Sequence, residues 1–262
     1  MSESTYMEAV SEVVRIAGDI AFGHYRLKPL VETKLDGTPV TIADRAAEAA
    51  AREWIERRFP DDGILGEEFS DVRPNARRRW IIDPIDGTKS FVSEVPFWGT
   101  LVAVADGDEI VAGAAFFPAT ADLIAAANGC GCWLNGSRSH VSQVADIGAA
   151  TILTSQSPFS PDESTSSRWI QLEKRSLMSR TWGDCFGYMM VASGRAEVMA
   201  DPKLSVWDIA PFLPIIREAG GTITDFSGAV TAFGGSAIAT NLVLGPTVRD
   251  ILIGKSNSPT GS

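Results

Sequence analysis

The 262-residue chain contains few cysteines, few histidines and no long apolar run, and each shortage argues against a class of protein. Its three cysteines cannot all pair, and they lack the spacing of a zinc site, so we expect reduced thiols. The two histidines, His24 and His140, have no recognisable catalytic partner in the sequence. No apolar run is long enough to cross a membrane, so we expect a globular protein without a membrane partner.

Positive charge is also scarce. The formal net charge is −10, and the basic run at 77–79 is too short to form a stripe. Nucleic acid is therefore a poor partner, because its phosphates need compensating positive charge. The first residues lack a basic region followed by an apolar stretch, which predicts no signal peptide and a cytoplasmic location.

One segment carries most of the functional information. Residues 80–91 read Trp-Ile-Ile-Asp-Pro-Ile-Asp-Gly-Thr-Lys-Ser-Phe, so an apolar strand leads into two carboxylates, Asp83 and Asp86. We expect Pro84 to end the strand, because proline has no N–H to donate to a sheet. Gly87 permits a tight turn whose free amides can meet an anion. Carboxylates beside open amides predict a place where Mg²⁺ and a phosphate group bind together.

Two other acidic segments fit the same chemistry. Glu67 and Glu68 follow an apolar pair at 64–65, and Asp208 lies at the start of a long apolar segment. Taken singly, such acids also suit an ordinary turn or a hydrated surface. The occurrence of all three segments in one chain favours a metal site.

Together these segments resemble the inositol monophosphatase family of Mg²⁺-dependent phosphatases. The resemblance rests on residues 66–68, 83–88, 207–208 and 218–221, and it extends from about residue 10 to residue 252. It implies a layered αβαβα sandwich with the site between its halves, and a homodimer. It also implies hydrolysis of a small phosphorylated metabolite by Mg²⁺-activated water, without a covalent nucleophile.

The resemblance also implies roles for single residues. The metal ligands would be the carboxylates of Glu67, Asp83, Asp86 and Asp208 and the backbone carbonyl of Ile85. The catalytic residues would be Asp44, Thr88 and Glu67, of which Asp44 and Thr88 hold and activate the attacking water. The amides of Gly87 and Thr88 would bind the phosphate. Ser90 departs from the asparagine that is common in the family, but no ligand is lost.

Asp44 has a second interpretation. With Thr41 it begins an alanine-rich segment that predicts a helix ending near Phe59. A carboxylate in the first turn of a helix is favoured by the helix dipole. The two roles are compatible, because the same dipole keeps the carboxylate ionised, as a base must be.

The order of predicted elements indicates a mixed α+β and α/β protein. Strands are expected at 79–83, 97–105, 109–117, 122–127 and 131–134, with hairpin turns at 106–108 and 135–136. Beyond residue 150, predicted strands alternate with helices. We expect an N-terminal half (1–148) with most metal ligands, a C-terminal half (149–254) with Asp208 and the substrate residues, and a flexible tail (255–262).

The helix expected at 206–219 contains two prolines at unfavourable positions. Pro211 and Pro214 lie past its first turn, where a proline removes a backbone hydrogen bond and costs about 3 kcal/mol. We therefore expect a kink or a later helix start close to Asp208.

Two further acids bear on the substrate. Asp184, a few residues after Arg180, gives a pattern that resembles the histidinol-phosphate phosphatase branch of the family, as does the stretch 91–98. Its carboxylate would pair with the ammonium group of histidinol phosphate, and Asp201 would contact the organic part. Asp184 also suits a helix N-cap, and Asp201 also suits a turn before Pro202. The resemblance thus implies a histidinol-phosphate phosphatase of histidine biosynthesis, with an inositol-1-phosphate or broad sugar-phosphate phosphatase as the alternative.

The sequence gives weaker support for other functions. Residues 132–139 match the Cys-x5-Arg-Ser pattern of cysteine phosphatases, but Trp133 and Leu134 are too bulky for a loop that surrounds phosphate. No Gly-x4-Gly-Lys-Ser/Thr run is present to indicate a P-loop kinase, and no added basic cluster suits a bisphosphate. A non-catalytic regulator that kept the fold is a hypothesis of another class, although every matched ligand position is filled.

Overall fold

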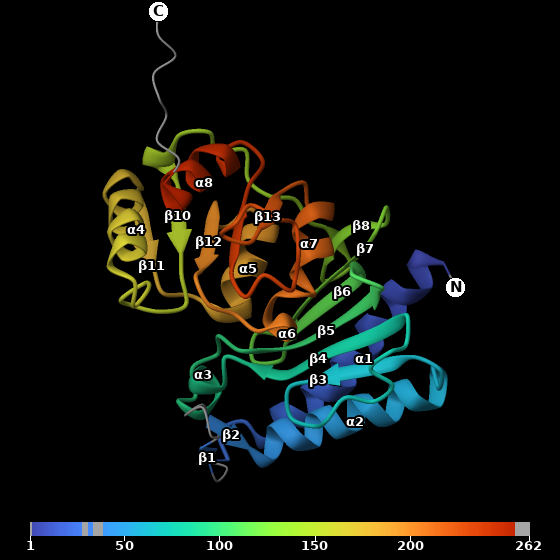
Figure 1. Ribbon diagram of the computed structural model, residues 1–262. Helices are drawn as coiled ribbons and strands as arrows, with labels where there is room; N and C mark the ends of the chain where they lie inside the picture. Colours follow the sequence, from blue (N-terminus) through green and yellow to red (C-terminus); the bar gives the residue numbers. More distant parts are fainter. Residues whose placement is uncertain (1, 28–30, 34–38, 255–262) are drawn as a thin grey trace, which may run out of the picture.

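The structure is a computed structural model that describes residues 2–27, 31–33 and 39–254, so the tail expected at 255–262 lies outside the described residues. One β-sheet of seven strands and one of five strands stack with helices between them and on both outer sides (Figure 1). A short hairpin, β1 (Val31–Thr33) and β2 (Pro39–Thr41), forms a separate sheet. This succession of layers confirms the expected αβαβα sandwich of the mixed α+β and α/β class.

The seven-stranded sheet comes from the first half of the chain. Its strands are β3 (Gly63–Gly66), β4 (Arg78–Asp86), β5 (Gly99–Asp106), β6 (Glu109–Phe117), β7 (Asp122–Ala127), β8 (Gly131–Leu134) and β9 (Ser137–Arg138). They lie side by side in sequence order, and only β3 and β4 run parallel. One face is covered by α1 (Glu3–His24) and α2 (Ile42–Arg58), which bury apolar side chains three or four residues apart, as the helical repeat requires.

The five-stranded sheet comes from the second half. Its order is β11 (Met178–Arg180), β10 (Thr151–Leu153), β12 (Val198–Asp201), β14 (Ala237–Thr240) and β13 (Thr222–Thr224). The inner face packs on α5 (Asp184–Ala192) and α7 (Phe212–Glu218), which also cover the larger sheet. The outer face is covered by α4 (Glu163–Arg175) and α8 (Gly245–Ile253).

The two hairpin turns expected from the sequence are confirmed. Asp106 pairs with Glu109 across the turn between β5 and β6, and Leu134 pairs with Ser137 across Asn135-Gly136. Both sequences combine a turn-forming polar residue with glycine, which tolerates the positive φ of a tight hairpin.

The expected end of a strand at Pro84 is wrong. β4 continues to Asp86, and its pairing with β5 shifts between the Asp83–Leu101 and Asp86–Gly99 pairs. Three residue steps on β4 match two on β5, so one extra residue is accommodated as a β-bulge. Residues three apart on a regular strand point to opposite faces, but the extra residue lets Asp83 and Asp86 point to the same side. Pro84, which has no N–H to donate to the sheet, therefore lies within the bulge between the two carboxylates.

The expected irregularity near Asp208 is confirmed. The helix is divided into α6 (Val206–Ile209) and α7, with Pro211 as the N-terminal residue that precedes α7. A Cβ added to Gly113 of β6 would lie 2.3 Å from the carbonyl oxygen of Pro211. The break therefore packs directly on the larger sheet, where no side chain fits between them. In the part of the chain that the structure describes, no helix is long and apolar enough to span a bilayer.

Candidate active site

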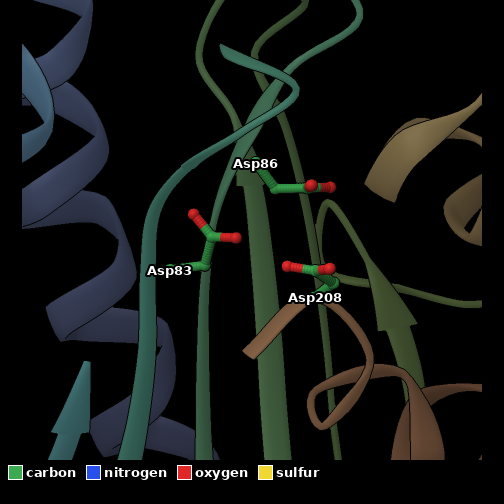
Figure 2. A group of neighbouring side chains, drawn as sticks. All are labelled: Asp83, Asp86 and Asp208. Carbon is green, nitrogen blue, oxygen red and sulfur yellow. The ribbon is translucent and has the colours of Figure 1, made fainter. Parts of the chain in front are cut away.

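Three carboxylates from the two halves of the chain meet between the sheets. Asp83 and Asp86 extend from the bulged end of β4, and Asp208 extends toward them from α6 (Figure 2). One oxygen from each carboxylate lies within 4.8 Å of the others. The structure thus brings together three of the acids that the sequence predicted as metal ligands.

Local hydrogen bonds hold each of these acids. The N–H of Ser205 donates to Oδ2 of Asp208 at 2.8 Å in a capping box at the start of α6. The N–H of Ile85 donates to Oδ1 of Asp83 at 3.1 Å, within the bulge. Asp86 accepts from the N–H of Cys185, in the first turn of α5. These bonds leave other carboxylate oxygens directed at the shared space.

The electrostatics of the cluster favour a bound cation. Burial and the charges of Glu67, Asp86 and Asp208 raise the pKa of Asp83 well above its ordinary value. Burial, followed by the charges of Asp184 and Asp208, does the same for the pKa of Asp86. Burial raises the pKa of Asp208 to about 6, with a contribution from Glu67. Like charges held this close are costly unless a positive charge or protons compensate them.

A pocket of about 170 Å³ surrounds the cluster. Its lining residues are Glu67, Asp83, Ile85, Asp86, Gly87, Thr88, Lys89, Asp184 and Asp208. The hydroxyl of Thr88 donates to the carbonyl of Ile85 at 3.0 Å. Gly87 has a φ of 84°, and a Cβ there would lie 2.9 Å from the carbonyl oxygen of Phe97, so only glycine suits the position. Most of the predicted site residues therefore line one pocket.

Asp44 lies in the first turn of α2, where it completes a capping box with Thr41. It is the third residue of α2, and its Oδ2 accepts from both the N–H and the hydroxyl of Thr41 at 2.7 Å. The helix from Thr41 to Phe59 is thus confirmed. Burial raises the pKa of Asp44 despite these bonds, and the charge of Glu67 adds to the rise. The interpretation of Asp44 as a first-turn carboxylate is confirmed, and its role in holding water stays a prediction.

The two substrate candidates lie in an adjoining pocket of about 160 Å³. Asp184 is the first residue of α5 and follows the cap Gly183, so its interpretation as an N-cap is wrong. Its N–H donates to Oγ of Ser155 at 2.8 Å, and its φ is 50°. Burial, with the charges of Asp201 and Asp208, raises its pKa to about 7, whereas Lys89 opposes the rise.

Asp201 is buried at the end of β12, so it belongs to a strand rather than to a turn. Its Oδ1 accepts from the N–H of Ser155, and its Oδ2 accepts from the hydroxyl of Tyr188, both at 3.0 Å. Ser155 therefore links the two candidate substrate acids. Neither Ser155 nor Tyr188 stood out in the sequence, because 46 residues separate Ser155 from Asp201. Lys89 was also missed, although it directly follows Thr88 in the central motif.

The cysteine-phosphatase alternative finds no support in the geometry. Residues 132–139 form the hairpin of β8 and β9 instead of a loop around an anion. Burial, with the charge of Glu218, raises the pKa of Cys132 to about 12, so its thiol stays protonated. Arg138 lies over the ring of Trp133.

Comparison with known proteins agrees with this geometry. The model of the inositol monophosphatase family matches residues 2–256. A histidinol-phosphatase of Chlorobaculum parvum is 40% identical over 233 residues, which are 88% of this chain and 90% of the relative. A histidinol-phosphatase of Mycobacterium tuberculosis is 39% identical over 230 residues, which are 86% of this chain and 88% of the relative.

A solved structure has the same architecture. The inositol monophosphatase (IMPase) of Thermotoga maritima superimposes with a TM-score of 0.86 at 30% sequence identity. The match covers 95% of this chain and 96% of that one. The likeness therefore includes both sheets and the region between them.

Proposed function

The chain belongs to the inositol monophosphatase family, and on that premise we propose that it is a Mg²⁺-dependent phosphatase that converts L-histidinol phosphate to L-histidinol and phosphate. The observation that carries the substrate is the carboxylate of Asp184, which lines the pocket of the acidic cluster. Both histidinol-phosphatase relatives support it over most of their length.

The donor set suits Mg²⁺. Asp83, Asp86 and Asp208 supply oxygen ligands on facing elements, and the proposal adds the carboxylate of Glu67 and the carbonyl of Ile85. Mg²⁺ prefers hard oxygen ligands and is commonly held by carboxylates together with substrate phosphate. Burial and the neighbouring carboxylates raise the pKa values of the three aspartates, so a bound cation would offset the cost of holding their charges together. When bound, the metal would polarise the phosphate and lower the pKa of the attacking water.

Protein groups would orient the reactants. Asp44 and Thr88 would hold the attacking water, and Glu67 would assist them in catalysis. The amides of Gly87 and Thr88 would bind phosphate oxygens, because the left-handed backbone at Gly87 turns the chain around that corner of the pocket. Lys89 lines the same pocket and adds positive charge near the anion. Positioning and charge compensation supply most of the catalysis in such transfers.

Asp184 would select the substrate through charge. A carboxylate at the edge of the phosphate pocket would pair with the ammonium group of histidinol phosphate. Asp201, which lines the adjoining pocket and accepts a hydrogen bond from the N–H of Ser155, would hold this side of the site and contact the organic part. An inositol-1-phosphate or broad sugar-phosphate phosphatase is the second candidate, favoured by the similarity to the Thermotoga maritima enzyme.

Membership of the family also supports proposals about the location, pathway and oligomeric state of the enzyme. We place the enzyme in the cytoplasm, in histidine biosynthesis, as a homodimer. Light scattering coupled to size-exclusion chromatography tests the dimer: a single species of twice the 28.0 kDa chain mass is expected.

Phosphate release from L-histidinol phosphate tests the proposal. Activity is expected with Mg²⁺, and it should disappear with excess EDTA and return when Mg²⁺ is restored. The Asp83→Asn variant, checked for folding by circular dichroism, should be inactive. Turnover that persists in EDTA would overturn the metal-dependent mechanism.

A further inference from the structure

Helix α2 presents three polar side chains at successive i, i+4 positions. Asp44, Glu48 and Arg52 therefore lie on one face of the helix. Asp44 already has a proposed role beside the water. Glu48 is fully buried, and Arg52 is largely covered, although both side chains carry charge. Burying a charged side chain is costly unless the side chain is paired and hydrogen-bonded.

Glu48 binds the chain directly after Glu67. Its Oε2 accepts from the N–H of Glu68 at 2.7 Å, and its Oε1 accepts from the N–H of Phe69 at 3.3 Å. A buried carboxylate that accepts from two consecutive amides fixes the orientation of those peptides. The backbone that leaves Glu67 is therefore held by a side chain of α2.

Arg52 completes the arrangement. Its Nε donates to Oε1 of Glu48 at 2.8 Å. Its two terminal nitrogens donate to the carbonyl oxygens of Ser70 and Phe69, each at 3.0 Å. The planar guanidinium can satisfy a carboxylate and two carbonyls at once, which an ammonium group cannot do with the same geometry.

Glu48 and Arg52 lie so close to Gly66 that they limit which residue can stand at position 66. A Cβ added to Gly66 would lie 2.1 Å from Oε1 of Glu48 and 2.9 Å from a terminal nitrogen of Arg52. Gly66 ends β3, and Glu67 follows it at once. The Glu48–Arg52 pair thus contacts the chain on both sides of Glu67.

We propose that Glu48 and Arg52 are positioning residues that hold Glu67 in the orientation needed to bind Mg²⁺. Neither residue lines the pocket of the acidic cluster, so both would act through Glu67. The inference rests on the proposed metal site and is independent of the proposed substrate. Residues that orient metal ligands typically change metal affinity by roughly 10- to 100-fold when they are replaced.

Calorimetric titration of the full chain with Mg²⁺ is the direct test. Glu48→Gln keeps the size of the side chain but replaces one acceptor by a donor that faces backbone N–H groups. Arg52→Lys keeps the charge but loses the forked contacts. Both variants should bind Mg²⁺ about 10-fold or more weakly. Their turnover of p-nitrophenyl phosphate should recover at high Mg²⁺, which a general loss of structure would not allow.

The helix offers a matched control. Glu53 and Arg57 form another i, i+4 pair on α2, with both side chains exposed. Glu53→Gln should leave Mg²⁺ affinity and turnover unchanged. If Glu48→Gln does not fold, the Mg²⁺ affinity of Arg52→Lys is the test of the proposed role. Wild-type Mg²⁺ affinity in a folded Glu48→Gln or Arg52→Lys variant would overturn the inference. If the wild-type chain binds no Mg²⁺, the proposed metal site itself fails.

Discussion

The backbone N–H of Cys185 donates a hydrogen bond to the carboxylate of Asp86. Asp86 ends β4 in the first half of the chain, whereas Cys185 lies in the first turn of α5 in the second half. The next residue toward the N-terminus, Asp184, directs its own carboxylate toward Gly87. The proposed metal site and the proposed substrate site therefore share one junction between the halves, and changes in either should affect the other.

Replacing Asp184 with asparagine should separate the two classes of substrate. The loss of a charge-assisted bond to ammonium costs about 1.5–3 kcal/mol, which corresponds to roughly 10- to 100-fold in kcat/KM. That loss should appear with L-histidinol phosphate and be much smaller with myo-inositol-1-phosphate, which has no ammonium group. Equal losses on both substrates would refute the role of Asp184 in selection.

The same variant should be more stable than the wild-type protein in the absence of metal. Asp184 has a φ of 50°, a region that asparagine tolerates well, and it adds negative charge beside Asp201 and Asp208. Asp184→Asn removes that repulsion and keeps the hydrogen bond from its N–H to Ser155. A higher Tm is expected by calorimetry in EDTA. A lower Tm would show that the negative charge supports the fold.

The metal-free protein should lose stability as the pH rises. The pKa values of Asp208, about 6, and Asp184, about 7, exceed the unfolded value of about 3.9. From about pH 4 to pH 7 the folded state therefore keeps protons that the unfolded chain has released, so the free energy of unfolding falls across this window. The Tm in EDTA should be lower at pH 8 than at pH 5, by roughly 4 °C or more.

Two controls belong to this pH series. Asp208→Asn should reduce the pH dependence, because one of the shifted groups is removed. Saturating Mg²⁺ at pH 8 should raise the Tm, since a ligand that binds only the folded state stabilises it, by about 2.7 kcal/mol at a concentration 100 times Kd. A Tm in EDTA that rises from pH 5 to pH 8 would contradict the account of the cluster.

Much of this site could be predicted from the sequence because its acids lie in short, recognisable segments. Asp83 and Asp86 stand in one run, and the break near Pro211 follows from the missing N–H of proline. The bulge that turns Asp83 and Asp86 to one side could not be predicted, because it depends on pairing with β5. The contacts of Glu48 with residues 68 and 69 also join segments that only the folded chain brings together.

Gly113→Ala tests the packing of the helix break. The added Cβ would lie 2.3 Å from the carbonyl oxygen of Pro211 and 2.6 Å from its Cα, so the backbone must shift. Overpacking of this kind costs about 1–3 kcal/mol. Asp208 lies three residues before Pro211, so Mg²⁺ affinity should fall as well. Chemical denaturation and Mg²⁺ titration measure the two effects.

Gly23→Ala in α1 is the matched control. Among the described residues, no atom outside its own stretch of helix lies within 4 Å of the added Cβ, and alanine in a helix is favoured over glycine by up to about 1 kcal/mol. This variant should be as stable as the wild-type protein or more stable, with unchanged Mg²⁺ affinity. Wild-type stability in Gly113→Ala would show that the contact between β6 and Pro211 is loose.

The proposed Mg²⁺ site is expected to act on an amine-bearing phosphate. The most direct measurement is kcat/KM for phosphate release from L-histidinol phosphate and from myo-inositol-1-phosphate, in parallel, with the same enzyme and saturating Mg²⁺. We expect a preference of at least about 10-fold for L-histidinol phosphate, the value of one charge-assisted bond. An equal rate, or a preference for myo-inositol-1-phosphate, would contradict it and favour the inositol or sugar phosphatase.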